Sequence, residues 1–108
     1  MQTQMPTQIP LMGEWKSTTS EATIFFDKGR VSGSDGCNRY GSSYSVVENN
    51  ISISNKMMST MMACESERMK SADTFRQALM AARHYHLDGK KIILMSNTGI
   101  IVEEFVLL

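Results

Sequence analysis

The chain has 108 residues, enough for one domain, and 42% of them are apolar, an ordinary fraction for a globular protein. Eleven basic and eleven acidic side chains cancel, so no nucleic-acid partner and no attraction to an anionic membrane is expected. No apolar run approaches the ~20 residues that cross a bilayer, which argues against a transmembrane segment.

Residues 1–10 are mostly Gln and Thr and are interrupted by Pro6 and Pro10. We therefore predict a flexible N-terminal lead-in over 1–10 and a folded domain over 11–108. The start lacks the charged and apolar regions of a signal peptide. The sequence thus leaves both the cytoplasm and the cell envelope open, and it leaves the oligomeric state unknown.

The first half of the domain is predicted to form short strands separated by turns. The run Ile51-Ser52-Ile53-Ser54 alternates apolar and polar residues, as a half-buried strand does. Asp27-Lys28-Gly29 is typical of a hairpin turn. The predicted strands cover residues 11–16, 22–26, 30–33, 42–47, 51–54 and an extended run over 57–64.

One segment has helical spacing. From Ser66 to Arg83, apolar side chains recur every three or four residues, and the segment is rich in alanine. We predict a helix with Ser66 as its N-cap and with Arg83 at the end where a positive charge is favourable. The apolar positions are Met69, Ala72, Phe75, Leu79 and Ala82.

Two further strands are predicted over residues 92–95 and 100–107, with a turn at Asp88-Gly89-Lys90 before the first. The total is about eight short strands and one helix. This indicates a single α+β domain in which a strongly curled antiparallel sheet buries one face against the helix.

Two runs stand out because they combine unusual backbone residues with the only cysteines. Gly33-Ser34-Asp35-Gly36-Cys37-Asn38-Arg39-Tyr40-Gly41 has three glycines, which favour sharp turns and positive φ. Asp35 and Asn38 can bond neighbouring amides and hold such a turn. The second run is Ser59-Thr60-Met61-Met62-Ala63-Cys64.

These runs, with Leu11-Met12-Gly13-Glu14-Trp15 before them and Tyr85-His86-Leu87-Asp88-Gly89 after the helix, resemble the META domain, the family of the heat-shock protein HslJ. The likeness extends from about Leu11 to Phe105. Met61, Glu65 and Ala72 depart from residues that the family often has at these places.

The resemblance implies a cracked β-barrel with one helix, in bacterial proteins that are often cell-envelope lipoproteins linked to heat stress. It implies no catalytic residue and no cofactor. We therefore expect a non-enzymatic binding domain of the envelope or the stress response. Its partner would be another envelope protein or a lipid, bound as a protein segment or an acyl chain.

The resemblance also implies that the two cysteine runs lie near one another. If the Cα atoms of Cys37 and Cys64 come within ~4.4–6.8 Å, a disulfide can form. The alternatives are two buried free thiols or one reactive thiol. The third would make the protein a thiol-dependent redox sensor or enzyme that uses Cys37 and Cys64.

Other chemistry has little support in the sequence. His84 and His86 could share one strand face, but no short metal-binding spacing accompanies them, so no metal site is expected. The glycines fit neither a phosphate loop nor a nucleophile elbow. We interpret Gly33, Gly36, Asn38 and Arg39 as a structural turn, with Asn38 and Arg39 in a polar network.

Four methionines occupy six residues: Met57, Met58, Met61 and Met62. Such side chains more often fill gaps in a core and less often form an adaptable binding surface. The sequence is compatible with both the core role and the binding-surface role. In the second, these methionines and Phe75 line the surface at which the domain binds its partner.

Overall fold

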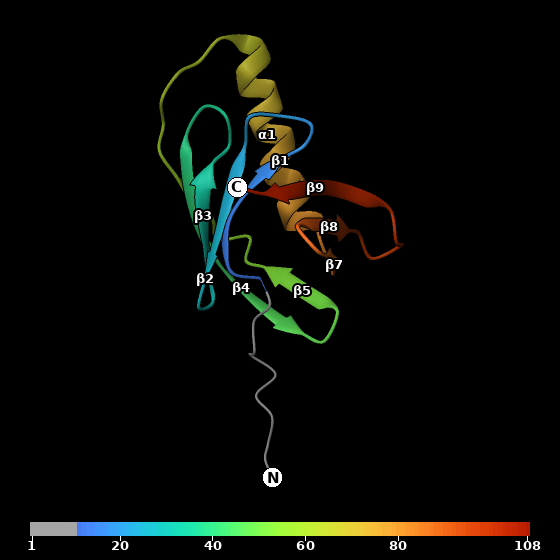
Figure 1. The fold of residues 1–108 in the computed structure, drawn as a ribbon. Helices are drawn as coiled ribbons and strands as arrows, with labels where there is room; N and C mark the ends of the chain where they lie inside the picture. Colours follow the sequence, from blue (N-terminus) through green and yellow to red (C-terminus); the bar gives the residue numbers. More distant parts are fainter. Residues whose placement is uncertain (1–10) are drawn as a thin grey trace.

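A computed structural model describes residues 11–108, and the predicted lead-in over 1–10 lies outside this range. Within it, nine antiparallel strands form one sheet that curls around a core, with one helix (Figure 1). The predicted α+β class is confirmed, with nine strands where about eight were expected. The elements are β1 (Gly13–Ser17), β2 (Thr23–Asp27), β3 (Arg30–Ser34), β4 (Arg39–Val47), β5 (Asn50–Ile53), β6 (Met58–Ser59), α1 (Ser66–Ala81), β7 (His84–Asp88), β8 (Lys91–Met95) and β9 (Ile101–Leu107).

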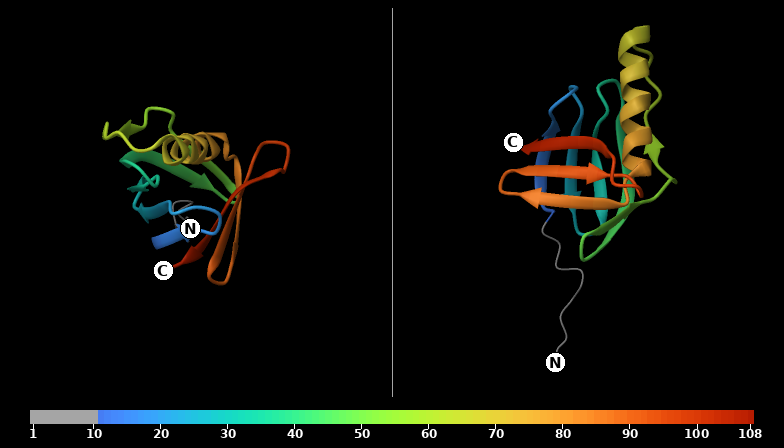
Figure 2. Two further views of the ribbon diagram at one scale, coloured as in Figure 1. Left: turned by 90° about the horizontal axis from the view of Figure 1, so that it is seen from above. Right: turned by 90° about the vertical axis from the view of Figure 1, so that its right-hand side faces the viewer.

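The sheet closes into a ring. Its strand order is β3-β2-β1-β9-β8-β7-β5-β4, and β4 pairs back with β3. Strands β7, β8 and β9 lie across β1 to β4, with the helix along one side (Figure 2). The seam between β5 and β7 is the weakest join, because only Asn50 and His84 pair across it.

The helix adds apolar side chains to the core inside the ring. Ala72, Phe75 and Leu79 are buried, and α1 packs against β9 and β5. Phe75 lies edge-on to Tyr40 and Phe105, with ring centroids 5.8 and 6.0 Å away. Other side chains that fill the interior with them include Leu11, Trp15, Ile24, Phe26, Val31, Tyr44, Ile53, Ile92 and Leu94.

The ends of the helix differ in one respect from the prediction. Glu65, in an extended conformation, holds the N-cap position and makes no side-chain cap bond, so Ser66 is the first helical residue. The predicted cap at Ser66 is wrong. At the other end, the Arg83 guanidinium donates to the carbonyls of Met80 and Ala82, each at 2.8 Å. This satisfies acceptors that the helix leaves open.

The predicted extended run over 57–64 forms a strand only at Met58–Ser59. These residues pair with Gly41 and Tyr40 of β4. One further backbone bond, from the Thr60 N–H to the Arg39 carbonyl at 3.0 Å, continues the ladder, and beyond it side-chain contacts replace the backbone pairing.

Candidate functional site

Asp35 organises the glycine-cysteine turn between β3 and β4. Its side chain is fully buried, and Oδ1 accepts the backbone N–H groups of Cys37 and Asn38 at 2.9 and 2.6 Å. Gly36, between Asp35 and Cys37, has a φ of +99°, which a residue with a side chain rarely adopts. The turn therefore depends on one carboxylate and one glycine acting together.

The same carboxylate ties the turn to the helix. Asp35 Oδ2 accepts a hydrogen bond from the Arg76 guanidinium, whose side chain is 25% exposed. Arg76 also lies 3.5 Å from the carboxylate of Asp73, one turn earlier in α1. An ionised carboxylate is stable in such a buried place only when it is paired, so Arg76 compensates the charge that the turn requires.

Gly33 belongs to β3 rather than to the turn itself. Its φ is +153°, and a Cβ atom added there would lie 2.3 Å from the carbonyl oxygen of Thr23 on β2. The close approach of two backbones explains why glycine is needed at this position. The interpretation of Gly33 and Gly36 as structural residues therefore has two separate physical reasons.

Asn38 holds the second cysteine run in place. Its Oδ1 accepts the Met62 N–H at 2.6 Å and the Thr60 hydroxyl at 2.8 Å, and its Nδ2 donates to the Met62 carbonyl at 3.3 Å. One side chain thus does for Met62 what a neighbouring strand would do. The predicted polar network at Asn38 is present.

Arg39 takes part in that network only through its backbone. Its carbonyl accepts the Thr60 N–H at 3.0 Å, and its own N–H donates to the Thr60 hydroxyl at 3.1 Å. The guanidinium is exposed and, within residues 11–108, makes no hydrogen bond or ion pair. Arg39 therefore belongs to the predicted network through its backbone, while alternation along β4 points its side chain outward.

Cys37 and Cys64 form a disulfide, with Cα atoms 6.1 Å apart. The bridge lies beside the contacts of Asn38 and closes the segment that carries β6 onto the turn. Of the three alternatives for these cysteines, the structure has the disulfide.

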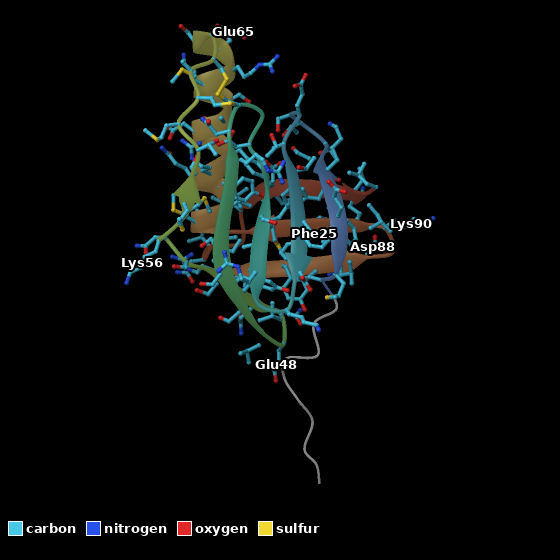
Figure 3. All side chains as sticks on the ribbon, turned by 90° about the vertical axis from the view of Figure 1, so that its left-hand side faces the viewer. Phe25, Glu48, Lys56, Glu65, Asp88 and Lys90 are labelled. Carbon is cyan, nitrogen blue, oxygen red and sulfur yellow. A yellow bond between two sulfur atoms is a disulfide. The ribbon has the colours of Figure 1, made fainter. Side chains whose placement is uncertain are left out.

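The methionine run lies at the surface. Met58, Met61 and Met62 are 75%, 92% and 58% exposed, so the core interpretation is wrong for them. Only Met57 packs against the core. Sulfur atoms gather along the segment between Lys56 and Glu65 and on the adjacent helix (Figure 3). Asn38 and the disulfide explain the exposure, because they hold this segment outside the ring.

A groove of about 460 Å³, here named the methionine groove, separates this segment from α1. Met57, Met61 and Met62 line one side, and Met69 and Met80 of the helix line the other. Its polar lining comes from Asn38, Asn55, Ser59, Thr60 and Arg76.

The segment presents a free backbone edge. Met58 and Thr60 direct their backbone groups to β4. In an extended chain, the N–H and C=O groups of alternate residues point to opposite sides. Those of Ser59 and Met61 therefore face away from β4, and no other part of residues 11–108 bonds them.

Phe75 does not join this groove. Its side chain is only 2% exposed and lies in the core between Tyr40 and Phe105. Its spacing in the helix places it on the face turned to the ring, whereas Met69, Arg76 and Met80 occupy the neighbouring face. The structure thus separates Phe75 from the methionines with which the sequence grouped it.

A second buried carboxylate joins β1 to β9. Glu103 is 8% exposed, and its Oε1 accepts hydrogen bonds from the hydroxyls of Ser17 and Thr19 at 3.1 and 3.3 Å. The Glu104 N–H donates to the same oxygen at 3.1 Å. This cluster was not predicted from the sequence, although a glutamate within an apolar strand is a signal for it. These contacts indicate a structural role for Glu103, which connects β1 to β9.

Tyr40 is buried, and the carboxylates of Asp35 and Glu103 influence it. Its hydroxyl donates to the Thr23 carbonyl at 2.8 Å. Burial raises the pKa of Tyr40 well above its ordinary value of 10.0, and the carboxylates of Asp35 and Glu103 raise it further. The protonated phenol is therefore favoured in the folded state, and its contribution is complete below pH ~10 and is lost as the pH rises above it.

Tyr40→Phe is expected to reduce the loss of stability at alkaline pH. The free energy of unfolding should fall more steeply above pH ~10 in the original protein than in the variant, which loses about 1 kcal/mol at pH 7 with its hydrogen bond. Urea unfolding between pH ~8 and ~11, followed by the fluorescence of Trp15, measures both slopes. Equal slopes would contradict the assignment to Tyr40.

Within residues 11–108, no helix is long and apolar enough to cross a membrane. Over the same range, His, Cys, Asp and Glu side chains form no group of three or more that could hold a metal ion. His84 and His86 lie on β7, which pairs with β8, and not in the turn that carries the disulfide.

Comparison with known proteins places the fold. An NMR structure of a protein from Burkholderia xenovorans is 19% identical, with a TM-score of 0.66, over 89% of this chain and 78% of that one. A crystal structure of a DUF4847 family protein from Bacteroides vulgatus has a TM-score of 0.72 at 13% identity, over 92% and 94%. These likenesses concern the fold alone.

A search of curated protein sequences finds no match. The family model described as the META domain matches residues 6–105, which include both cysteine runs, the helix and most of β9. The chain therefore belongs to the META domain family.

Proposed function

We propose that this META domain is a non-enzymatic binding domain that captures an extended protein segment along the methionine groove. The observation that carries the proposal is the unpaired backbone edge at Ser59 and Met61 beside that groove. A polypeptide laid there would add a strand to β6 and place alternate side chains among the methionines. Methionine suits such a role because its flexible thioether adapts to varied partners.

A protein segment fits this surface better than an acyl chain. Backbone N–H and C=O groups need hydrogen-bond partners, and a hydrocarbon chain would cover them without supplying any. The interior of the ring is filled by aromatic and branched side chains, including Trp15, Phe26 and Phe105. The open groove therefore favours a ligand with its own backbone donors and acceptors.

The charged residues near the groove indicate which kind of protein segment would bind there. Arg76 is the one charged residue in the groove lining within the described part of the chain, and Asp35 and Asp73 already pair with it. The exposed Lys56 and Arg39 adjoin the same segment. We therefore expect a preferred segment with apolar side chains and at least one acidic residue.

The disulfide supports a location in an oxidising compartment, because such bonds persist in the cell envelope and are rare in the cytosol. On this basis the proposal includes a role in the envelope or the stress response. The redox alternative has less support. Asn38 already holds the segment by three hydrogen bonds, so the bridge acts as a second restraint on a fixed structure.

The test is a proline placed on the free edge. Ser59→Pro removes an N–H that faces away from β4, so the existing ladder keeps its bonds. Peptides of about twelve residues selected from a random displayed library should bind the original protein. Their dissociation constants, measured by fluorescence anisotropy, should rise about tenfold with Ser59→Pro, which is about 1.4 kcal/mol.

Ser59→Ala is the matched control, because it removes the hydroxyl and keeps the N–H. It should bind the selected peptides within about twofold of the original protein. The proposal is wrong if no peptide is enriched, or if Ser59→Pro and Ser59→Ala bind equally well. Amide hydrogen exchange adds a direct readout, since bound peptide should protect Ser59 and Met61.

A further inference from the structure

The methionine groove collects most of the thioethers of the described chain. Met1 and Met5 lie outside residues 11–108, which leaves eight of the ten methionines. Five of these eight line one groove: Met57, Met61, Met62, Met69 and Met80. Apolar packing does not account for this choice, because Met61 is 92% exposed and Met69 47%.

The donor set of the groove is chemically selective. Thioether sulfur is a soft ligand that favours Cu(I) and its congener Ag(I), whereas Mg²⁺, Ca²⁺ and Mn²⁺ prefer oxygen and Zn²⁺ prefers thiolate or imidazole. Among the described residues, the groove lining includes no carboxylate, imidazole or thiol. The charge of Arg76 is already compensated by Asp35 and Asp73.

The path of the chain places thioethers on both sides of the groove, some on the methionine run and some on α1. The chain reverses after Cys64, so the end of the methionine run faces the first turns of α1, and its beginning faces the last turns. Met61 and Met62 thus lie opposite Met69, at the end that the disulfide and Asn38 hold in place. Long unbranched side chains on a fixed backbone can turn their sulfur atoms to a common point.

We propose that the methionine groove binds one Cu(I) or Ag(I) ion, with Met61, Met62 and Met69 as thioether ligands. The ion enters as a monovalent cation and leaves the disulfide intact, so no electron is transferred. This site is separate in chemistry from peptide capture, because thioether coordination requires sulfur and strand addition requires the backbone edge.

Silver is the first probe, because it is stable in air. Titration with silver nitrate in chloride-free buffer, followed by native mass spectrometry, should give one bound ion with the disulfide still present. Methionine methyl carbons labelled with ¹³C should shift at Met61, Met62 and Met69 and stay unchanged at Met12 and Met95. Cu(I) supplied without oxygen should compete for the same site.

Replacement of the three ligands by leucine separates coordination from apolar contact. Met61→Leu, Met62→Leu and Met69→Leu together keep size and hydrophobicity and remove three sulfur atoms, so the variant should fold with a free energy of unfolding within about 1.5 kcal/mol of the original. The affinity for Ag(I) should fall at least about tenfold. Ser59→Pro should weaken peptide binding and still bind the ion, because it changes the backbone edge and keeps all three thioethers.

Met12→Leu with Met95→Leu is the matched control, because both residues lie outside the groove. This variant should bind Ag(I) like the original protein. The proposal is overturned if the triple leucine variant binds Ag(I) as tightly as the original, as it would through His84 and His86. Equal methyl shifts at all methionines would also overturn it.

Discussion

Arg76→Ala is expected to lower the free energy of unfolding by about 3 kcal/mol, because it leaves the buried carboxylate of Asp35 without its cation. The two amides at Asp35 Oδ1 remain bonded, but they do not replace a full positive charge. Urea unfolding followed by the fluorescence of the single tryptophan, Trp15, measures the loss.

Arg68→Ala is the control on the same helix. Its ion pairs with Glu21 and Glu65 are long, at 3.9 and 3.7 Å, and exposed, so its loss should cost less than about 0.5 kcal/mol. Asp35→Ala combined with Arg76→Ala should cost at least about 1 kcal/mol less than the sum of the single changes. Additive effects would show that the pair is not coupled.

Removal of the disulfide is expected to cost about 3.5 kcal/mol, because a loop of 27 residues regains its freedom in the unfolded chain. The double variant Cys37→Ser with Cys64→Ser measures this by urea unfolding. Since Asn38 still binds Thr60 and Met62, the variant should fold with the same ring of strands.

A reducing agent supplies the control for the disulfide. It should lower the stability of the original protein by a similar amount and leave the double serine variant unchanged. Alkylation of the protein without reductant should find no thiol, native or denatured. A reactive thiol in the native state, or equal stability with and without reductant, would contradict the structural role assigned to the bridge.

Much of the fold could be predicted because its signals are local. Helical spacing located α1 to within two residues at its end. The Asp27-Lys28-Gly29 turn is confirmed by positive φ values at Lys28 and Gly29, which such a hairpin turn requires. The glycine-cysteine run could be interpreted as structural, because glycine and Asp/Asn have specific backbone uses.

The candidate site could be predicted only in part, because exposure depends on distant contacts. The methionine run resembles a core strand until Asn38 and Cys37, more than 20 residues earlier, hold it outside the ring. Phe75 is an aromatic side chain of the kind that binding surfaces use, but in the structure it is buried in the core. The partner of Asp35 lies 41 residues away in the helix, at a distance that no local pattern reports.

The class of fold, the helix, the turns and the family can be inferred from the sequence alone, since each depends on residue type and short-range spacing. The closure of the ring, the disulfide, the buried pair of Asp35 and Arg76, and the exposure of the methionines become apparent only in the folded structure. These features depend on which residues meet across the chain. Burial, charge compensation and free backbone edges exist only once the strands have paired.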